Sequence, residues 1–185
     1  MASLVGSAAV AIYTIGMQFN SLFIAFSTAI CGVFTPQIYK HVYEPDGNKK
    51  LTELMIKVGR IQFYIVFFVW IIFVIFGRSF IMLWAGKEFE NSYYVGLLLT
   101  TPIIIALMQN VGIEILRAYN KHQMRTMLHM LLAIINVIIS IPLTKMYGEI
   151  GCAIGTCIST FVSSTLISNY FYSKVINLEI KAVFK

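Results

Sequence analysis

Five long apolar runs constrain this chain more than any other feature. They cover residues 10–34, 61–84, 93–116, 127–143 and 150–172, and the connections between them are short. A helix that crosses the hydrocarbon core of a membrane needs about 20 mostly apolar residues. Charged residues make up 12% of the 185-residue chain, whereas they make up about a quarter of a typical soluble domain. The runs therefore predict an all-α integral membrane protein with about five transmembrane helices.

The positions of the tyrosines distinguish membrane spans from helices buried in a large soluble protein. All ten tyrosines lie within a few residues of the end of a predicted span. Tyrosine rings favour the lipid headgroup level, whereas a soluble core would scatter them. The runs also lack the alternation of polar and apolar residues that membrane β-barrels show. The five apolar runs are therefore interpreted as transmembrane helices.

Lysine and arginine fall unevenly on the two sides of the predicted membrane. Only Arg78, Lys87 and Lys145 lie on one side. The residues on the other side are Lys40, Lys49, Lys50, Lys57, Arg60, Arg117, Lys121, Arg125, Lys174, Lys181 and Lys185. Because cytoplasmic loops retain positive charge, we expect the amino terminus outside and the carboxyl terminus in the cytoplasm. The net charge of +6 then reflects topology and anionic membrane lipids, and no nucleic-acid partner is expected.

The sequence offers little for catalysis. It has no Ser/His/Asp set, no HExxH motif and no glycine-rich loop with a following lysine, the patterns that carry common chemistries. The outward connections, residues 85–92 and 144–149, are too short for glycan polymerase or ligase chemistry. Cys31, Cys152 and Cys157 lie inside apolar runs and are interpreted as small buried residues. We expect no enzyme, no cofactor and no metal site.

Polar residues inside the predicted spans form stripes along helix faces. In the third span, Asn110, Glu114, Arg117 and Lys121 follow a helical spacing, with Gln109 beside them. The fourth span carries His129, Ala133, Asn136, Ser140 and Thr144 at intervals of four, three, four and four, and Arg125 precedes it. The first span contains Gln18, Asn20, Ser21, Ser27 and Thr28. Polar residues are costly in lipid, so the helix faces that carry them indicate where a span contacts another helix or a functional path.

Two interpretations of these stripes remain open. In the first, the polar side chains join helices through hydrogen bonds worth ~0.6 kcal/mol each. In the second, they line a water-filled path, which ionised groups such as Glu114 and Arg117 favour. These two residues are spaced to form an ion pair. Their closeness to the cytoplasmic end also allows them simply to extend toward the headgroups.

The fifth span opens with small residues at every fourth position, namely Gly151, Gly155, Ser159 and Ser163. Such a face lets another helix approach closely. The preceding segment "MYGEIG" is interpreted as the outward turn of a tight helical hairpin. We expect Pro142 to end the rigid part of the fourth span and the glycines to bring the returning helix against its neighbour.

Several segments resemble a known transporter family. They are "VAIYTIGMQFNSLFIAFSTAICGVFTPQIYK", "FGRSFIMLWAGKEF", "ILRAYNKHQMR" and "IINVIISIPLTKMYGEIGCAIGT". In this order they are similar to the oligosaccharide flippases of bacterial polysaccharide biosynthesis, within the multidrug/oligosaccharidyl-lipid/polysaccharide exporter superfamily. The resemblance runs over nearly the whole chain and corresponds to the front of the second of two lobes.

The resemblance implies alternating access around a central cavity in the bacterial cytoplasmic membrane. The implied cargo is an undecaprenyl-diphosphate-linked oligosaccharide, and membrane lipids and the missing first lobe are the implied partners, with self-association as an alternative. The family has no short signature, so the substrate path is assigned from helical spacing. Its candidate residues are Gln109, Asn110, Glu114, Arg117, Lys121, Arg125, His129 and Asn136.

Other functions are compatible with the same spans. One is a cation-coupled multidrug exporter of the same superfamily, although no aspartate lies inside a predicted span. Another is a membrane fragment or interaction module without transport activity. Since alternating access generally needs two bundles, we expect the chain alone to insert into a membrane without moving a lipid-linked glycan.

Overall fold

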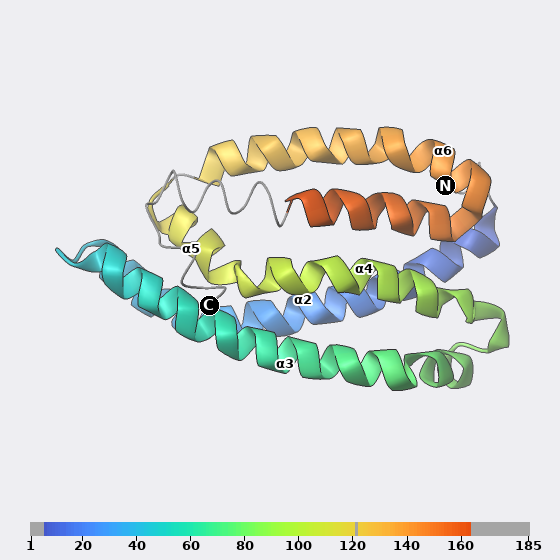
Figure 1. Cartoon of the computed structure of the whole chain (residues 1–185), viewed down its shortest axis with the longest axis horizontal. Helices are drawn as coiled ribbons and strands as arrows, with labels where there is room; N and C mark the ends of the chain where they lie inside the picture. Colours follow the sequence, from blue (N-terminus) through green and yellow to red (C-terminus); the bar gives the residue numbers. More distant parts are fainter. Residues whose placement is uncertain (1–5, 121, 164–185) are drawn as a thin grey trace.

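The computed structural model describes residues 6–120 and 122–163, and within them the fold is all-α. Figure 1 shows the order of the elements along the chain. They are α2 (Ser7–Val42), α3 (Gly47–Trp84), the short 3-10 helix η1 (Lys87–Phe89), α4 (Asn91–Met108), α5 (Asn110–Ala118) and α6 (His122–Val162). The predicted all-α class is confirmed.

Within residues 6–120 and 122–163, four helical stretches are long and apolar enough to cross a membrane. They are Ser7–Val42, Gly47–Trp84, Lys87–Met108 and Arg125–Val162. Large apolar side chains also cover the outside of the bundle: Leu83 is 90% exposed and Phe76 62%. Apolar surface of this extent is stable in lipid and not in water. The chain is therefore a multi-pass membrane protein.

The last of these stretches contains the predicted span 127–143 and the first part of the span 150–172, because α6 folds back on itself. Gly148 has φ 60° and ψ −136° inside α6, a backbone conformation that glycine adopts at little cost. Figure 1 shows the chain reversing direction there, so that a first arm, residues 122–147, lies beside a second arm, residues 149–162. The turn falls within the predicted "MYGEIG" segment. The predicted span 150–172 extends beyond the described residues.

Pro142 does not end the first arm, contrary to expectation. It lies inside α6, and helix continues to the turn at Gly148. A proline removes one backbone hydrogen bond from a helix, and membrane helices tolerate that loss where neighbouring groups satisfy the freed carbonyl. The change of direction therefore depends on the glycine, whose positive φ a helical residue cannot supply.

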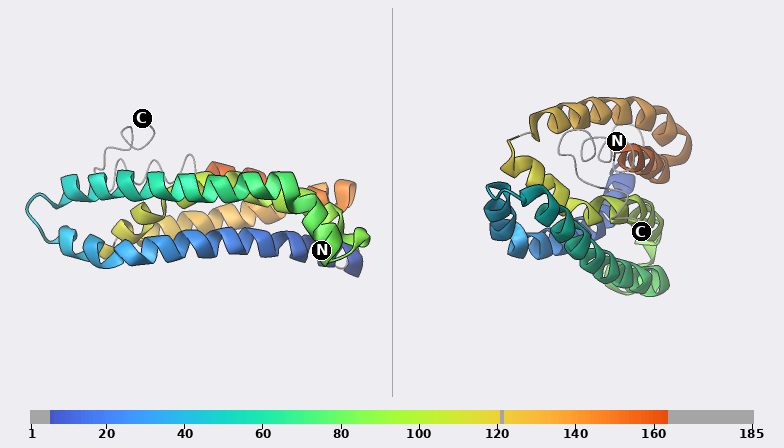
Figure 2. Two further views of the ribbon diagram at one scale, coloured as in Figure 1. Left: turned by 90° about the horizontal axis from the view of Figure 1, so that it is seen from below. Right: turned by 60° about the vertical axis from the view of Figure 1, so that its left-hand side comes forward.

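α4 occupies the centre of the bundle. It packs against α2, α3 and α6, and the right-hand view of Figure 2 shows α6 covering one side of the group formed by the other long helices. The connections after α2 and after α5 lie at one end of the molecule, whereas η1 and the turn inside α6 lie at the other (Figure 1). We call the former the basic end, because it carries Lys40, Lys49 and Lys50.

α2 and α3 are longer than a membrane requires. They contain 36 and 38 residues, which correspond to roughly 54 and 57 Å at about 1.5 Å per residue, whereas the hydrocarbon core is about 30 Å thick. At the basic end they pack on α5 around a buried cluster that contains Ile38, Leu51, Met55, Ile115 and Leu116. This end of the bundle thus has an apolar core of its own.

The predicted third span is not one continuous helix. α4 ends at Met108 and α5 begins at Asn110. At the break, the backbone N–H of Gln109 donates to the Ala106 carbonyl over 3.1 Å, a tighter turn than the α-helix uses. α5 ends at Ala118, and Asn120 has φ 55°. The predicted stripe therefore does not run to Lys121 on one helix, and Lys121 itself lies outside the described residues.

A polar cavity between α4, α5 and α6

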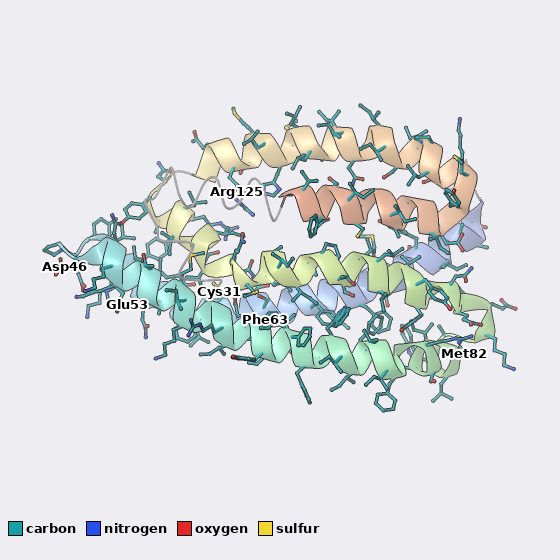
Figure 3. The ribbon with its side chains drawn as sticks, viewed as in Figure 1. Cys31, Asp46, Glu53, Phe63, Met82 and Arg125 are labelled. Carbon is teal, nitrogen blue, oxygen red and sulfur yellow. The ribbon has the colours of Figure 1, made fainter. Side chains whose placement is uncertain are left out.

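A cavity of about 370 Å³ lies between the broken helix α4–α5 and the two arms of α6. Ile24 of α2 contributes to one wall, and Ile103 and Leu107 of α4 to another. The polar residues that line it are Asn110, Arg125, His129, Asn136, Ser159, Thr160 and Ser163. In Figure 3, Arg125 lies between the first arm of α6 and α5. Four of the predicted path residues, Asn110, Arg125, His129 and Asn136, thus border one space.

Arg125 and His129 supply polar nitrogens to this cavity. They are four residues apart on the first arm, which places them on the same helix face. The His129 Nδ1 lies 3.0 Å from the Oγ of Ser163, which directly follows the second arm. Among the described residues, neither the buried Arg125 Nε nor the buried His129 Nε2 has a hydrogen-bond partner. Buried polar atoms usually have one, so these two nitrogens are exceptions at the cavity wall.

The small-residue face of the second arm packs against the first arm. A Cβ added to Gly151 would overlap the Leu143 carbonyl oxygen, and one added to Gly155 would overlap the Ser140 Oγ. Farther along, the Ser159 hydroxyl lies 3.5 Å from the Leu132 carbonyl. The glycines therefore set how closely the arms approach, and this approach brings Ser163 within reach of His129.

Three other predicted path residues that the structure describes, Gln109, Glu114 and Arg117, do not line the cavity. The Arg117 Nη1 donates to the Glu114 Oε1 over 2.6 Å on α5, as their spacing indicated. The Arg117 side chain is 57% exposed, and neither residue lines the cavity. Gln109 is buried at the break between α4 and α5. Two cations of the predicted path are therefore separated, with Arg125 at the cavity and Arg117 in an exposed ion pair.

A buried hydrogen-bonded group adjoins the cavity at the break. The Asn110 Nδ2 donates to the Ser27 Oγ over 2.8 Å, and the Gln62 Nε2 donates to the Ser27 carbonyl over 3.0 Å. Ser27 and Gln62 are fully buried. Sequence analysis had not singled out Gln62. A polar side chain inside the run 61–84 was the available signal, but its partner lies 35 residues away on another helix.

α2 carries a second polar surface. Thr14, Gln18, Ser21, Ala25 and Thr28 are exposed, and their alternating spacing of four and three residues places them on one helix face. The hydroxyls of Thr14 and Ser21 donate to the carbonyls of Val10 and Met17, one turn earlier. α2 has a second exposed face, which is apolar and contains Leu22 and Phe26. The face with Thr14 and Ser21 is the more polar of the two.

In chemical terms, the cavity offers one guanidinium, one imidazole and several hydroxyl and amide groups inside an apolar bundle. Such a set suits a ligand with anionic oxygens and hydroxyl groups, because guanidinium groups bind phosphate and carboxylate oxygens through paired hydrogen bonds. Comparisons of the chain with protein-family models, with curated proteins and with solved structures find no match.

Proposed function

We propose that this chain is part of a membrane transporter that moves a lipid-linked oligosaccharide across the bacterial cytoplasmic membrane. The observation that carries the proposal is a cavity inside the bundle whose lining includes the ionisable residues Arg125 and His129 together with amide and hydroxyl side chains. Intramembrane ionisable groups generally face a functional cavity and mark substrate pathways. The sequence resemblance to oligosaccharide flippases supports the same function.

The groups that line the cavity suit the diphosphate and the sugars of this cargo. A diphosphate and its sugars lose their hydration when they enter hydrocarbon, and a buried charge without a partner is very costly. Arg125 supplies a positive charge with a planar set of donors for phosphate oxygens. Asn136 and Thr160 supply groups that exchange hydrogen bonds with sugar hydroxyls. The polyprenyl tail would remain in the surrounding lipid.

Two further features support this proposal. A volume of about 370 Å³ is within the usual range of small-ligand sites, and it would hold a headgroup portion and not a whole glycan. The exposed polar face of α2 would extend a hydrophilic route beyond the cavity. The cations of the basic end support a cytoplasmic position for that end, where such a cargo would be loaded.

The test compares two arginines in the purified full chain. The chain is reconstituted in lipid nanodiscs, and the binding of a fluorescent polyprenyl-diphosphate glycan is measured. Arg125→Ala should weaken binding by at least roughly tenfold, since hydrogen bonds to charged groups contribute about 1.5–3 kcal/mol. Arg117→Ala is the matched control, because Arg117 is exposed and paired with Glu114 outside the cavity lining. It should leave binding unchanged.

Two results would contradict the proposal. The first is that the original chain and Arg125→Ala bind the fluorescent glycan equally well, although both insert into the nanodiscs and unfold at the same temperature. The second is equal affinity for polyprenol without a diphosphate, which would show that the chain recognises only the apolar tail. Thermal unfolding of each variant, measured in the same nanodiscs, separates a loss of binding from a loss of structure.

A further inference from the structure

One face of α3 is exposed over most of the helix and changes from basic to apolar along its length. The opposite face, which includes Leu51, Met55 and Gln62, is buried. Intervals of three or four residues place a series of exposed side chains on the same helix face. We call this series the α3 outer face, and it consists of Lys49, Glu53, Lys57, Arg60, Tyr64, Phe68, Ile71 and Ile75. Glu53, which is labelled in Figure 3, lies in its basic part.

The charged residues of α3 indicate how the helix lies across a bilayer. No residue between Arg60 and Arg78 is charged, and that section of helix is roughly 27 Å long at about 1.5 Å per residue. The hydrocarbon core of a membrane is about 30 Å thick, so the two arginines match its two boundaries. Tyr64 is 70% exposed one turn inside Arg60, where a tyrosine ring favours the headgroup level. Arg60 and Lys57, one turn farther out, are therefore at the depth of lipid phosphates.

The cations at this depth carry charge that the protein does not neutralise. Among the described residues, neither Lys57 nor Arg60 forms an ion pair, although Glu53 lies one turn from Lys57. Lys50, by contrast, is paired with Glu44 at 2.6 Å. Lys57 and Arg60 are both exposed, and lysine and arginine form strong, charge-assisted hydrogen bonds with phosphate oxygens. The two side chains can therefore bind an anionic group in the headgroup region.

The surface next to these cations is apolar. Phe68 is 64% exposed and Ile75 is 63% exposed, and Ile71 lies between them on the α3 outer face. A phospholipid presents groups in the same order, because its phosphate is followed by ester oxygens and then by hydrocarbon chains. An acidic protein segment would suit the cations but would leave this apolar part without a matching partner. The order of groups on the face therefore favours a lipid.

We propose that the α3 outer face binds an anionic phospholipid, with the phosphate at Lys57 and Arg60, the ester groups near the Tyr64 hydroxyl and a chain along Phe68 and Ile71. Phosphatidylglycerol fits this description better than phosphatidylcholine, whose cationic headgroup the same side chains repel. One cation near an anionic lipid surface gives about a fivefold preference. The inference goes beyond the proposed function, since it concerns a lipid of the surrounding membrane and does not involve the cavity.

Brominated lipids test this site in the full chain. Phe68→Trp, combined with Trp70→Phe and Trp84→Phe, places the only indole on the α3 outer face. The chain is reconstituted in bilayers of phosphatidylcholine with a minor fraction of phosphatidylglycerol, and bromine on the acyl chains of one or the other lipid quenches the indole. We expect the ratio of phosphatidylglycerol to phosphatidylcholine beside the indole to exceed the bulk ratio by at least about threefold. Both leaflets have the same composition, so the orientation of the chain does not affect the result.

Charge variants of this reporter chain show which residues cause the enrichment. The double variant Lys57→Gln/Arg60→Gln should reduce it to the bulk ratio, whereas Lys57→Arg/Arg60→Lys keeps both charges and should keep it. The matched control is Lys87→Gln/Lys145→Gln, which removes two exposed lysines at the other end of the bundle and should leave the enrichment unchanged.

Three results would overturn the proposal. They are the absence of enrichment in the reporter chain, enrichment that survives the loss of Lys57 and Arg60, and an equal loss in the Lys87→Gln/Lys145→Gln control. Thermal unfolding in the same bilayers verifies that each variant is folded. Neither the cavity nor a glycan enters this measurement, so failure of the proposed function would leave the result intact, and the two proposals fail separately.

Discussion

The His129 Nδ1, on the first arm of α6, lies 3.0 Å from the Oγ of Ser163 at the end of the second arm. The two residues are separated by 34 positions along the chain, and the turn at Gly148 brings them together. This contact orients the His129 ring at the wall of the cavity. The shape of the cavity therefore depends on how closely the arms pack, which is controlled by glycines far from His129.

Gly151 should be the position in the hairpin most sensitive to substitution. In Gly151→Ala the added Cβ would overlap the backbone oxygen of Leu143, and a rotation of a side chain cannot relieve that overlap. We expect the arms to separate and the free energy of unfolding to fall by roughly 1–3 kcal/mol, as in other overpacked sites. Thermal unfolding followed by circular dichroism in detergent micelles measures the change.

Gly32→Ala is the control for this substitution. Gly32 is exposed, and a Cβ there would meet nothing within 4 Å. Alanine favours helix over glycine by about 0.5–1 kcal/mol, so this variant should be as stable as the original chain or slightly more stable. Equal melting temperatures for the two variants would show that the arms do not pack as closely as the structure indicates.

The two outer faces of α2 should differ in their access to water. If the face that contains Thr14, Ser21 and Thr28 borders a hydrophilic route, single cysteines there should react with a charged thiol reagent in a cysteine-free chain in membranes. Cysteines at the exposed apolar positions Leu22 and Phe26 should stay unreactive, because hydrocarbon disfavours both the thiolate and the reagent. Similar, low reactivity at all five positions would mean that both faces contact lipid.

Glu44 should titrate below the ordinary glutamate range. Its carboxylate accepts a hydrogen bond from Lys50 over 2.6 Å and another from His41 over 3.1 Å. These bonds, with Lys50 the larger cause, lower the pKa of Glu44 from its ordinary value of 4.5. The carboxyl carbon of Glu44, followed by NMR, should report this lower pKa. Lys50→Ala should move it back toward 4.5, whereas Lys50→Gln would separate loss of charge from loss of the hydrogen bond.

The lowered pKa of Glu44 determines how its contribution to stability changes with pH. Because the folded-state pKa is lowered, the contribution of Glu44 to the α2–α3 connection is complete above the ordinary pKa. It is lost as the pH falls through the lowered pKa. The effect on overall stability should be small, since the group is solvent-exposed and such pairs are screened by water. A Glu44 pKa above 4.5 would contradict the geometry of this connection.

The two ends of the bundle should react differently in intact cells. Asp46, at the tip of the α2–α3 connection in Figure 3, lies at the basic end, which the lysine and arginine distribution predicts to be cytoplasmic. In a cysteine-free chain, Asp46→Cys should be protected from a membrane-impermeant maleimide until the cells are permeabilised. Glu88→Cys, in η1 at the other end, should react at once. The reverse pattern would invert the predicted orientation.

The sequence alone was sufficient for features that depend on neighbouring residues. Apolar runs of spanning length predicted the long helices, and the spacing of Glu114 and Arg117 predicted their ion pair. The segment "MYGEIG" predicted a turn, and Gly148 supplies it with a positive φ. In each case the physical cause lies within one or two helical turns, namely the 3.6-residue period, the hydrophobicity of a run or the conformational freedom of a glycine.

Only the tertiary structure decided where α4 is interrupted and which cation borders the cavity. The break at Gln109 lies in an apolar run that reads as one helix. Ser27 of α2 hydrogen-bonds residues on both sides of it, Leu107 and Asn110, and the Asn110–Ser27 pair spans 83 residues of sequence. Likewise, the predicted substrate path contained both Arg117 and Arg125, whereas the break and the turn after Ala118 direct them to different surfaces. Such choices depend on which distant groups satisfy a buried polar atom, and a local pattern carries no information about partners on other helices.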